Sequence, residues 1–180
     1  MKSLLESILN KSGVGKIYQI QSWLDEYGIK NYTINNKGEI DVDGDVSLSG
    51  CGLTEFPQFI QFGTVKGQFG CAFNGLTSLR GCPRIVKKNF YCHGNNLTSL
   101  EGAPSVVGKD FYCSTNKLTS LEGAPEAVRG NFYCGFNLLN TLEGAPERVT
   151  GYFNCSHNST KFTEDDVRKV CKVKKGIIVK

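Results

Sequence analysis

A unit of 21 residues is repeated through the middle of this 180-residue chain. In each unit a phenylalanine, a cysteine and an asparagine are followed by two leucines, a proline and a valine at constant spacing. The phenylalanines are Phe69, Phe90, Phe111, Phe132 and Phe153, and the cysteines are Cys71, Cys92, Cys113, Cys134 and Cys155. Such a period predicts a solenoid, because one unit cannot bury its apolar side chains without its neighbours.

Each unit is expected to contain one short strand. The pattern F-x-C-x-x-N-x-L-x-x-L resembles the template of leucine-rich repeats. Because side chains alternate along a strand, Phe90 and Cys92 should point into the core and Tyr91 outward. Asn95 should bond to backbone groups where the chain leaves the strand. The strands should form a parallel sheet, with irregular or short 3₁₀ structure on the convex side, since a unit of 21 residues has no room for a long helix.

The composition, with 39% hydrophobic and 21% charged residues, excludes a disordered chain. No run of roughly 18 apolar residues occurs, so no membrane span is expected. The first residues resemble an amphipathic helix and not a secretion signal, so the eight cysteines are expected to be free thiols in the cytoplasm. Five equally spaced cysteines on one face offer no tetrahedral cluster, which favours core packing over a metal site.

The ends of the chain differ from the repeats and are expected to cap them. Residues 1–50 should form an N-terminal cap of two helices, in MKSLLESIL and KIYQIQSWLDEYGI, and of strands with a hairpin turn at Asn35–Gly38. Residues 51–162 should form the solenoid. Residues 163–180 should form a C-terminal cap, with a short helix whose N-cap is Thr163 and a final strand.

The units LTSLEGAP, FYCSTNKLTSL and GNFYCGFNLLNTLEGAP, preceded by IKNYTINNKGEIDVDGDVSLSGCGLTEFP, resemble the short leucine-rich-repeat proteins of tailed bacteriophages. The resemblance covers residues 29–162. It implies a parallel β-sheet solenoid and a phage gene product that acts in the cytoplasm of an infected host bacterium. Leucine-rich-repeat proteins generally bind other macromolecules through the concave sheet face, and the resemblance implies no reaction.

Two stretches are similar to known ligand loops but lack essential residues. SGVGK has Asn10 in place of the first phosphate-loop glycine and Ile17 in place of the Ser or Thr, so we expect a plain turn between two helices. DVDGDV has its glycine one place early and Gly52 where a calcium loop needs Glu, so we expect a solvated acidic edge. With no catalytic pattern found, the protein is expected to be non-enzymatic and to use no cofactor or metal.

The positions that the repeat leaves variable indicate where a partner would bind. The residue between each Phe and Cys should point outward, which gives a row of Tyr91, Tyr112, Tyr133 and then Asn154. Polar and aromatic residues flank this row: Asn89, Asp110, Asn131 and Tyr152 on one side, and Phe73, His93, Phe136 and His157 on the other. A contiguous exposed aromatic surface is typical of a binding face. The alternative is that duplication has kept tyrosines that only pack across strands.

Two functions follow from this face. In the first, whose setting is what the resemblance to phage proteins implies, the chain is a phage protein that binds a host bacterial protein, such as a defence component, and inhibits or redirects it. In the second, the tyrosine row stacks on the bases of a nucleic acid or nucleotide, while a basic rim binds phosphates. The rim consists of Lys66, Lys87, Lys88, Lys109 and Arg129. The host protein's identity and the oligomeric state stay open.

Overall fold

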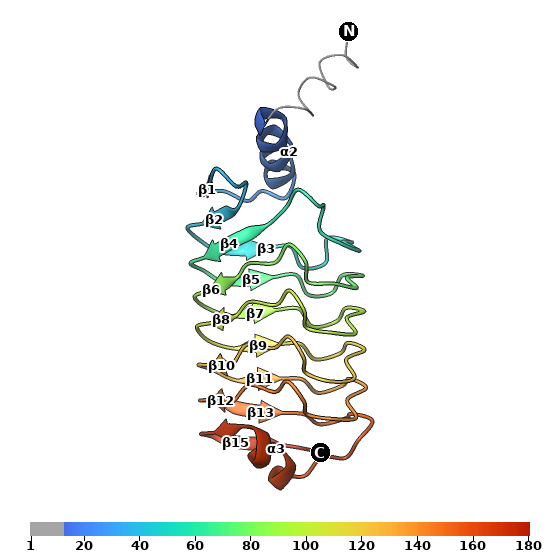
Figure 1. Ribbon diagram of the computed structural model, residues 1–180. Coiled ribbons are helices and arrows are strands. Elements are labelled where there is room, and N and C mark those ends of the chain that lie inside the picture. Colours follow the sequence, from blue (N-terminus) through green and yellow to red (C-terminus); the bar gives the residue numbers. More distant parts are fainter. Residues whose placement is uncertain (1–12) are drawn as a thin grey trace.

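The computed structural model describes residues 13–180, which form a parallel β-solenoid with a helix at each end (Figure 1). Helix α2 spans Gly13–Glu26 and helix α3 spans Glu164–Val170. Between them the chain winds repeatedly through two sheets, which we name the valine sheet and the tyrosine sheet. The predicted fold class, a repeat solenoid with a parallel sheet and a helical element at each end, is confirmed.

The tyrosine sheet has seven strands in the described part of the chain. They are β3 Val46–Ser47, β5 Phe69–Gly70, β7 Phe90–Tyr91, β9 Phe111–Tyr112, β11 Phe132–Tyr133, β13 Tyr152–Asn154 and β15 Gly176–Ile178. Each strand pairs in parallel with its counterpart in the next turn, as in the register Phe90↔Phe111. The strands predicted around each F-x-C are therefore confirmed, and so is their parallel, sequential order.

Apart from the two strands of the predicted hairpin, the valine sheet was not predicted. Its eight strands are β1 Tyr32–Ile34, β2 Ile40–Val42, β4 Phe62–Val65, β6 Ile85–Val86, β8 Val106–Val107, β10 Ala127–Val128, β12 Arg148–Val149 and β14 Lys172–Val173. The valine of each unit is buried and pairs in register with the next, as in Val86↔Val107. The return loops between the tyrosine sheet and the next valine strand are irregular, as expected. Because both sheets repeat at the spacing of paired strands, the turns stack in the nearly straight column of Figure 1.

The core consists of columns of identical residues, one member from each turn. The phenylalanine side chains are fully buried, and neighbouring rings such as those of Phe90 and Phe111 have centroids 5.2 Å apart. The five cysteines of the repeat are free and buried, as predicted. The Cys113 thiol donates a weak hydrogen bond to the Tyr133 carbonyl in the next turn at 3.3 Å. Burial raises the pKa of Cys113 far above its ordinary value, so the thiol stays protonated.

The N-terminal end of the core is closed by α2, whose buried residues are Ile20, Trp23 and Leu24. The Trp23 ring lies edge-on to Phe62, the first residue of β4 in the valine sheet, with the ring centroids 6.4 Å apart. The hairpin is confirmed, because β1 and β2 pair antiparallel around the turn that includes Asn35–Gly38. The helix begins at Gly13, so the end of the SGVGK stretch is helical and the turn expected there is wrong. The other predicted helix, in residues 1–9, lies outside the described residues.

At the C-terminal end, α3 takes the place of a return loop. Thr163 caps it as predicted, since its hydroxyl accepts from the Asp166 N–H and the Asp166 carboxylate accepts from the Thr163 N–H. The chain then continues into β14 and β15, which add one more strand to each sheet. Among the described residues, no helix combines the length and apolar character needed to cross a membrane.

Candidate functional site

The predicted tyrosine row lies on the outer face of the tyrosine sheet, where the rings form a continuous stack. Tyr91, Tyr112 and Tyr133 are in register on β7, β9 and β11. The ring centroids are 4.9 Å and 4.6 Å apart, with interplanar angles of 25° and 16°. This spacing equals the distance between paired strands, so the backbone sets the stack. Both faces of the Tyr112 ring are covered by its neighbours, and the rings are half-buried.

The polar residues on one side of the row have a structural task that the sequence analysis missed. The Asn89 Oδ1 atom accepts the Asp110 N–H at 3.1 Å, and the Asp110 Oδ1 atom accepts the Asn131 N–H at 2.7 Å. The Asn131 Oδ1 atom accepts the Tyr152 N–H at 2.8 Å. Each side chain therefore bonds to the backbone of the next turn. Asn154 is also engaged, because its Oδ1 atom accepts from the Ser156 N–H at 3.0 Å.

The tyrosine hydroxyls differ in their partners. The Tyr91 hydroxyl accepts from the Asn89 amide at 2.7 Å, and the Tyr112 hydroxyl donates to the Asp110 carboxylate at 3.3 Å. Burial, and then the Asp110 charge, raise the pKa of Tyr112 to about 12. The Tyr133 hydroxyl makes no hydrogen bond within residues 13–180. It is the hydroxyl of the stack whose donor and acceptor functions are both open to a partner, since the other two hydroxyls each use one.

On the other side of the row, one position of each turn has a left-handed backbone. The φ angles are 52° at Phe73, 68° at Gly94, 56° at Thr115, 55° at Phe136 and 53° at His157. We name these five residues the left-handed column. Aromatic and β-branched residues are strained in this conformation by about 1–2 kcal/mol, whereas glycine is not. Because the scaffold accepts glycine here, the bulky residues are not required by the fold.

The two phenylalanines of this column are the most exposed large apolar side chains on this face. Phe73 is 67% exposed and Phe136 is 57% exposed. Neither ring is buried in the core, so the fold gains little that offsets their strain. Strained conformations at exposed positions are typical of functional sites. The left-handed geometry was not predicted, and the glycine at position 94 was its signal in the sequence.

Each of these phenylalanines contacts one of the two histidines. The Phe73 and His93 rings meet edge-on with centroids 4.7 Å apart, and the Phe136 and His157 rings stack at 4.2 Å. His93 precedes Gly94 and so lies one residue outside the left-handed column, whereas His157 belongs to it. The buried Nδ1 atom of His93 has no hydrogen-bond partner in the described structure, and burial lowers the pKa of His93, so its ring is neutral.

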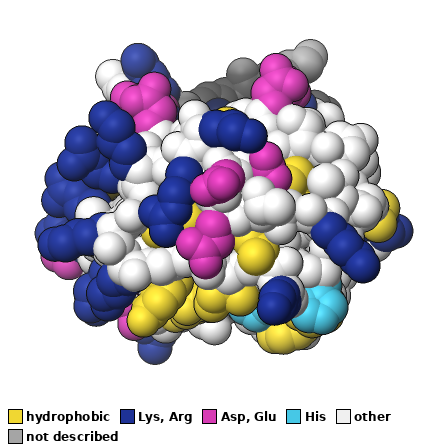
Figure 2. All heavy atoms as spheres, turned by 90° about the horizontal axis from the view of Figure 1, so that it is seen from below, with side chains coloured by type: hydrophobic (Ala, Val, Ile, Leu, Met, Phe, Trp, Pro, Cys, Tyr) yellow, Lys and Arg dark blue, Asp and Glu magenta, His cyan; other side chains and the backbone are white. Residues whose placement is uncertain are grey.

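A strip of cations lies at the opposite edge of the tyrosine sheet, in the short turns that connect the two sheets. We name it the basic corner, and it consists of Lys66, Lys87, Lys88, Lys109, Arg129, Lys174 and Lys175. The last two were missed because α3 lengthens the final return loop and breaks the 21-residue period. In Figure 2, which looks onto the C-terminal end, Lys and Arg side chains gather along one side, while hydrophobic and histidine side chains lie on the neighbouring side.

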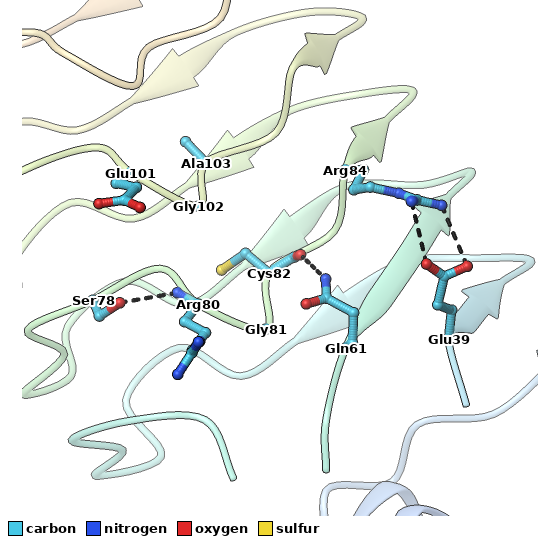
Figure 3. Close-up of a pocket in the computed structure, with 10 residues that line it drawn as sticks. All are labelled: Glu39, Gln61, Ser78, Arg80, Gly81, Cys82, Arg84, Glu101, Gly102 and Ala103. Carbon is cyan, nitrogen blue, oxygen red and sulfur yellow. Dashed lines mark hydrogen bonds and ion pairs between the residues drawn. The ribbon is translucent and has the colours of Figure 1, made fainter. Parts of the chain in front are cut away.

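Beside the valine sheet, the return loops enclose a pocket of about 640 Å³ that the sequence analysis did not anticipate (Figure 3). A salt bridge between Arg84 and Glu39, with N–O distances of 3.2 and 3.3 Å, lies at one end of it. The Gln61 amide donates to the Cys82 carbonyl at 3.0 Å. Burial holds the pKa of the Cys82 thiol well above its ordinary value, so it is not an activated nucleophile.

Within residues 13–180, no group of three or more His, Cys, Asp or Glu side chains could hold a metal ion. The acidic stretch around Asp43 instead contacts the next turn. Asp41 accepts the Thr64 N–H, Asp45 accepts the Gln68 N–H, and Asp43 pairs with Lys66 at 2.8 Å. Comparison with models of protein families, with curated proteins and with solved structures found no match.

Proposed function

We propose that this protein is a non-enzymatic binding module that captures another protein on the outer face of the tyrosine sheet. The observation that carries the proposal is the pair Phe73 and Phe136. Each is exposed, and each has a backbone conformation that costs about 1–2 kcal/mol more than glycine would at the same position. Within the described fold, the contact of each ring with a histidine offsets only part of these costs. Burial of the two rings against a partner would compensate, since aromatic anchors supply most of the energy at protein interfaces.

The rest of the face supports this role. Each phenylalanine packs on a histidine, which restricts its motion before a partner arrives and so lowers the entropy lost on binding. The tyrosine stack is held rigid by its contacts and by hydroxyl bonds to Asn89 and Asp110. A rigid aromatic surface with polar edges is typical of a protein interface.

The setting of the proposal comes from the sequence. The resemblance to leucine-rich-repeat proteins of tailed bacteriophages supports a phage product whose partner is a host bacterial protein. In this proposal binding inhibits or redirects that protein, in the host cytoplasm.

Nucleic-acid binding is the weaker candidate. Its support is the basic corner beside an aromatic row, which is the combination that single-strand binders use. However, base stacking needs an open ring face, and the Tyr112 ring lies between Tyr91 and Tyr133. The stack therefore offers ring edges along its length, which suits side chains of a protein better than bases.

The test is affinity capture from lysates of phage-infected bacteria with immobilised wild type and the double variant F73G/F136G. We expect the variant to melt at or above the wild-type temperature, because glycine relieves the strain of the left-handed conformation, and to lose the captured protein. The matched control T115G removes the same backbone strain without removing an aromatic ring, and it should still capture the protein. Equal capture by F73G/F136G and wild type would overturn the proposal.

A further inference from the structure

Most cations of the basic corner have no ion-pair partner within the described residues, and this indicates the charge of the partner. Lys66 pairs with Asp43 at 2.8 Å and Lys88 with Asp45 at 3.7 Å. The other five cations of the corner make no ion pair with any described residue. They are Lys87, Lys109, Arg129, Lys174 and Lys175.

Lys87, Lys109 and Arg129 lie in three successive turns of the solenoid, and Lys174 and Lys175 lie two turns further on, beyond a turn that has Thr150 and Gly151 at this place. The Lys109 N–H donates to the Lys88 carbonyl at 3.1 Å, and the Lys175 N–H donates to the Gly151 carbonyl at 3.2 Å. Adjacent turns are separated by the spacing of paired strands, about 4.8 Å. Like charges at such distances lie within one Debye length of about 10 Å, so they repel each other in the free protein.

The acidic groups near the corner relieve only part of this repulsion. Asp110 follows Lys109 and keeps its negative charge, while its oxygens accept from the Asn131 N–H and from the Tyr112 hydroxyl and it makes no ion pair with a described residue. Glu101, Glu122 and Glu143 lie in the return loops, Glu126 and Glu147 lie just before β10 and β12, and none of the five makes an ion pair with the corner. With seven cations against the carboxylates of Asp43, Asp45 and Asp110, the corner keeps a net positive charge along one edge of the tyrosine sheet.

From this geometry we infer that the partner presents an acidic, extended segment, which lies along the solenoid axis with its carboxylates on the basic corner and its apolar side chains on the tyrosine stack. The inference rests on the proposed function and adds the chemistry of the partner. Charge complementarity of this kind selects the partner and its register and speeds association. A protein segment fits better than a nucleic acid, because the stack presents ring edges and the free Tyr133 hydroxyl.

The segment would contact two neighbouring columns, the cations of the basic corner and the tyrosines of the stack. Lys87 and Lys109 precede Tyr91 and Tyr112 by four and three residues respectively. At about 3.3 Å per residue, the cations lie roughly 10–13 Å or less from the tyrosine column. Carboxylate side chains on one edge of an extended peptide and apolar ones on the other could reach both columns at once.

The experiment measures binding of defined probes by fluorescence anisotropy. The probes are a labelled peptide of alternating glutamate and leucine, the same peptide with glutamine in place of glutamate, and an oligothymidylate of equal charge. We expect the glutamate peptide to bind, and the glutamine peptide and the oligothymidylate to bind at least about tenfold more weakly. Tighter binding of the oligothymidylate, equal binding of the two peptides, or no binding of the glutamate peptide would each overturn the inference.

Variants locate the contact. K109Q/R129Q should weaken binding of the glutamate peptide by about five- to tenfold, because two charge-assisted contacts are lost. The control K117Q/K161Q lowers the net charge equally in exposed return-loop residues and should bind as wild type does. Equal weakening by both variants would mean a general charge effect and would also refute the inference. If lysate capture depends on Phe73 and Phe136 but not on Lys109 and Arg129, the proposed function stands and this inference fails.

Discussion

Two columns that are neighbours in every turn behave in opposite ways. The left-handed column is followed directly by the asparagine column, which consists of Asn74, Asn95, Asn116, Asn137 and Asn158. The asparagines are the same in all five turns, whereas the residues just before them are Phe, Gly, Thr, Phe and His. Where the fold depends on the hydrogen bonds of one side chain, the same residue occurs in every turn. Where the fold requires only a left-handed backbone, the side chain can vary and can contact a partner.

The asparagine column is a hydrogen-bonded ladder inside the protein. The Asn116 Nδ2 group donates to the Cys92 and Cys113 carbonyls, each at 3.1 Å, and the Asn116 Oδ1 atom accepts the Leu97 N–H at 3.0 Å. The side chain thus bonds to its own turn and to the preceding one. A carboxamide offers two N–H donors and an oxygen acceptor in one plane. Glutamine has the same group but is one methylene longer, so it would not fit the same positions.

The largest effect is expected for N116A. It leaves backbone groups of Leu97 and Cys92 buried without a partner, and each such group costs about 1–3 kcal/mol. The free energy of unfolding measured with urea should fall by about 3 kcal/mol or more. The control N140A removes an exposed asparagine and should change it by less than about 0.5 kcal/mol. Equal effects of the two substitutions would contradict the ladder as a source of stability.

The tyrosine stack lies between the two extremes, since its rings are half-buried and stacked on one another. The triple variant Y91A/Y112A/Y133A should remain folded but lose about 1–3 kcal/mol, because two stacked contacts of about 0.5–1.5 kcal/mol each are removed. Urea unfolding measures the loss, and lysate capture should be abolished. A variant that unfolds at room temperature would assign the stack to the scaffold, and one that still captures the partner would place the binding face elsewhere.

Opposite substitutions within the left-handed column should have opposite signs. In G94A the new Cβ atom would lie 2.7 Å from the Phe73 ring, and the alanine would have to adopt the strained left-handed backbone conformation. The free energy of unfolding should therefore fall by about 1–2 kcal/mol. In T115G the strain is relieved, and the free energy of unfolding should rise by up to about 1 kcal/mol, reduced by the greater freedom of glycine in the unfolded chain. Calorimetric melting temperatures that shift in the same direction for both variants would refute the strain argument.

The smallest effect concerns the C-terminal cap. The Thr163 hydroxyl and N–H hold the pKa of Asp166 at about 2, below its ordinary value of 3.8, and Lys169 contributes further. A carboxyl group whose pKa is lowered in the folded protein stabilises the fold at pH values above its ordinary pKa. This contribution is lost as the pH falls from about 4 toward 2. The melting temperature of D166N should therefore fall less than that of wild type over this range. Parallel curves for the two proteins would show that the cap does not couple to pH.

Several sequence predictions hold because they depend on local geometry. The alternation in F-x-C predicts that Phe90 and Cys92 are inside and Tyr91 outside, and the structure agrees. Thr163 was recognised as an N-cap because capping involves only the next three residues. The tyrosine row was found for the same reason, since one residue between two inward-pointing neighbours must face outward.

Other features were missed because their cause lies in another turn. The valine strands are only two residues long in most turns, and the bonds that make them strands come from the neighbouring turns. Asn89 and Asp110 looked like free polar side chains, but each bonds to a backbone N–H 21 residues further along the chain. Lys174 and Lys175 joined the basic corner only through the pairing of β12 with β14 and β13 with β15.

By itself, therefore, the sequence determined the period, the inward columns and the outward tyrosines. The period is visible when the units are aligned, and the direction of each side chain follows from the alternation along a single strand. Only the tertiary structure decided which polar residues brace the scaffold and which backbone positions are left-handed. Those properties depend on hydrogen bonds and packing between turns, as when Phe73 donates its N–H to the His93 carbonyl and lays its ring against Gly94. Strain at an exposed phenylalanine becomes visible only when both the φ angle and the absence of a covering side chain are known.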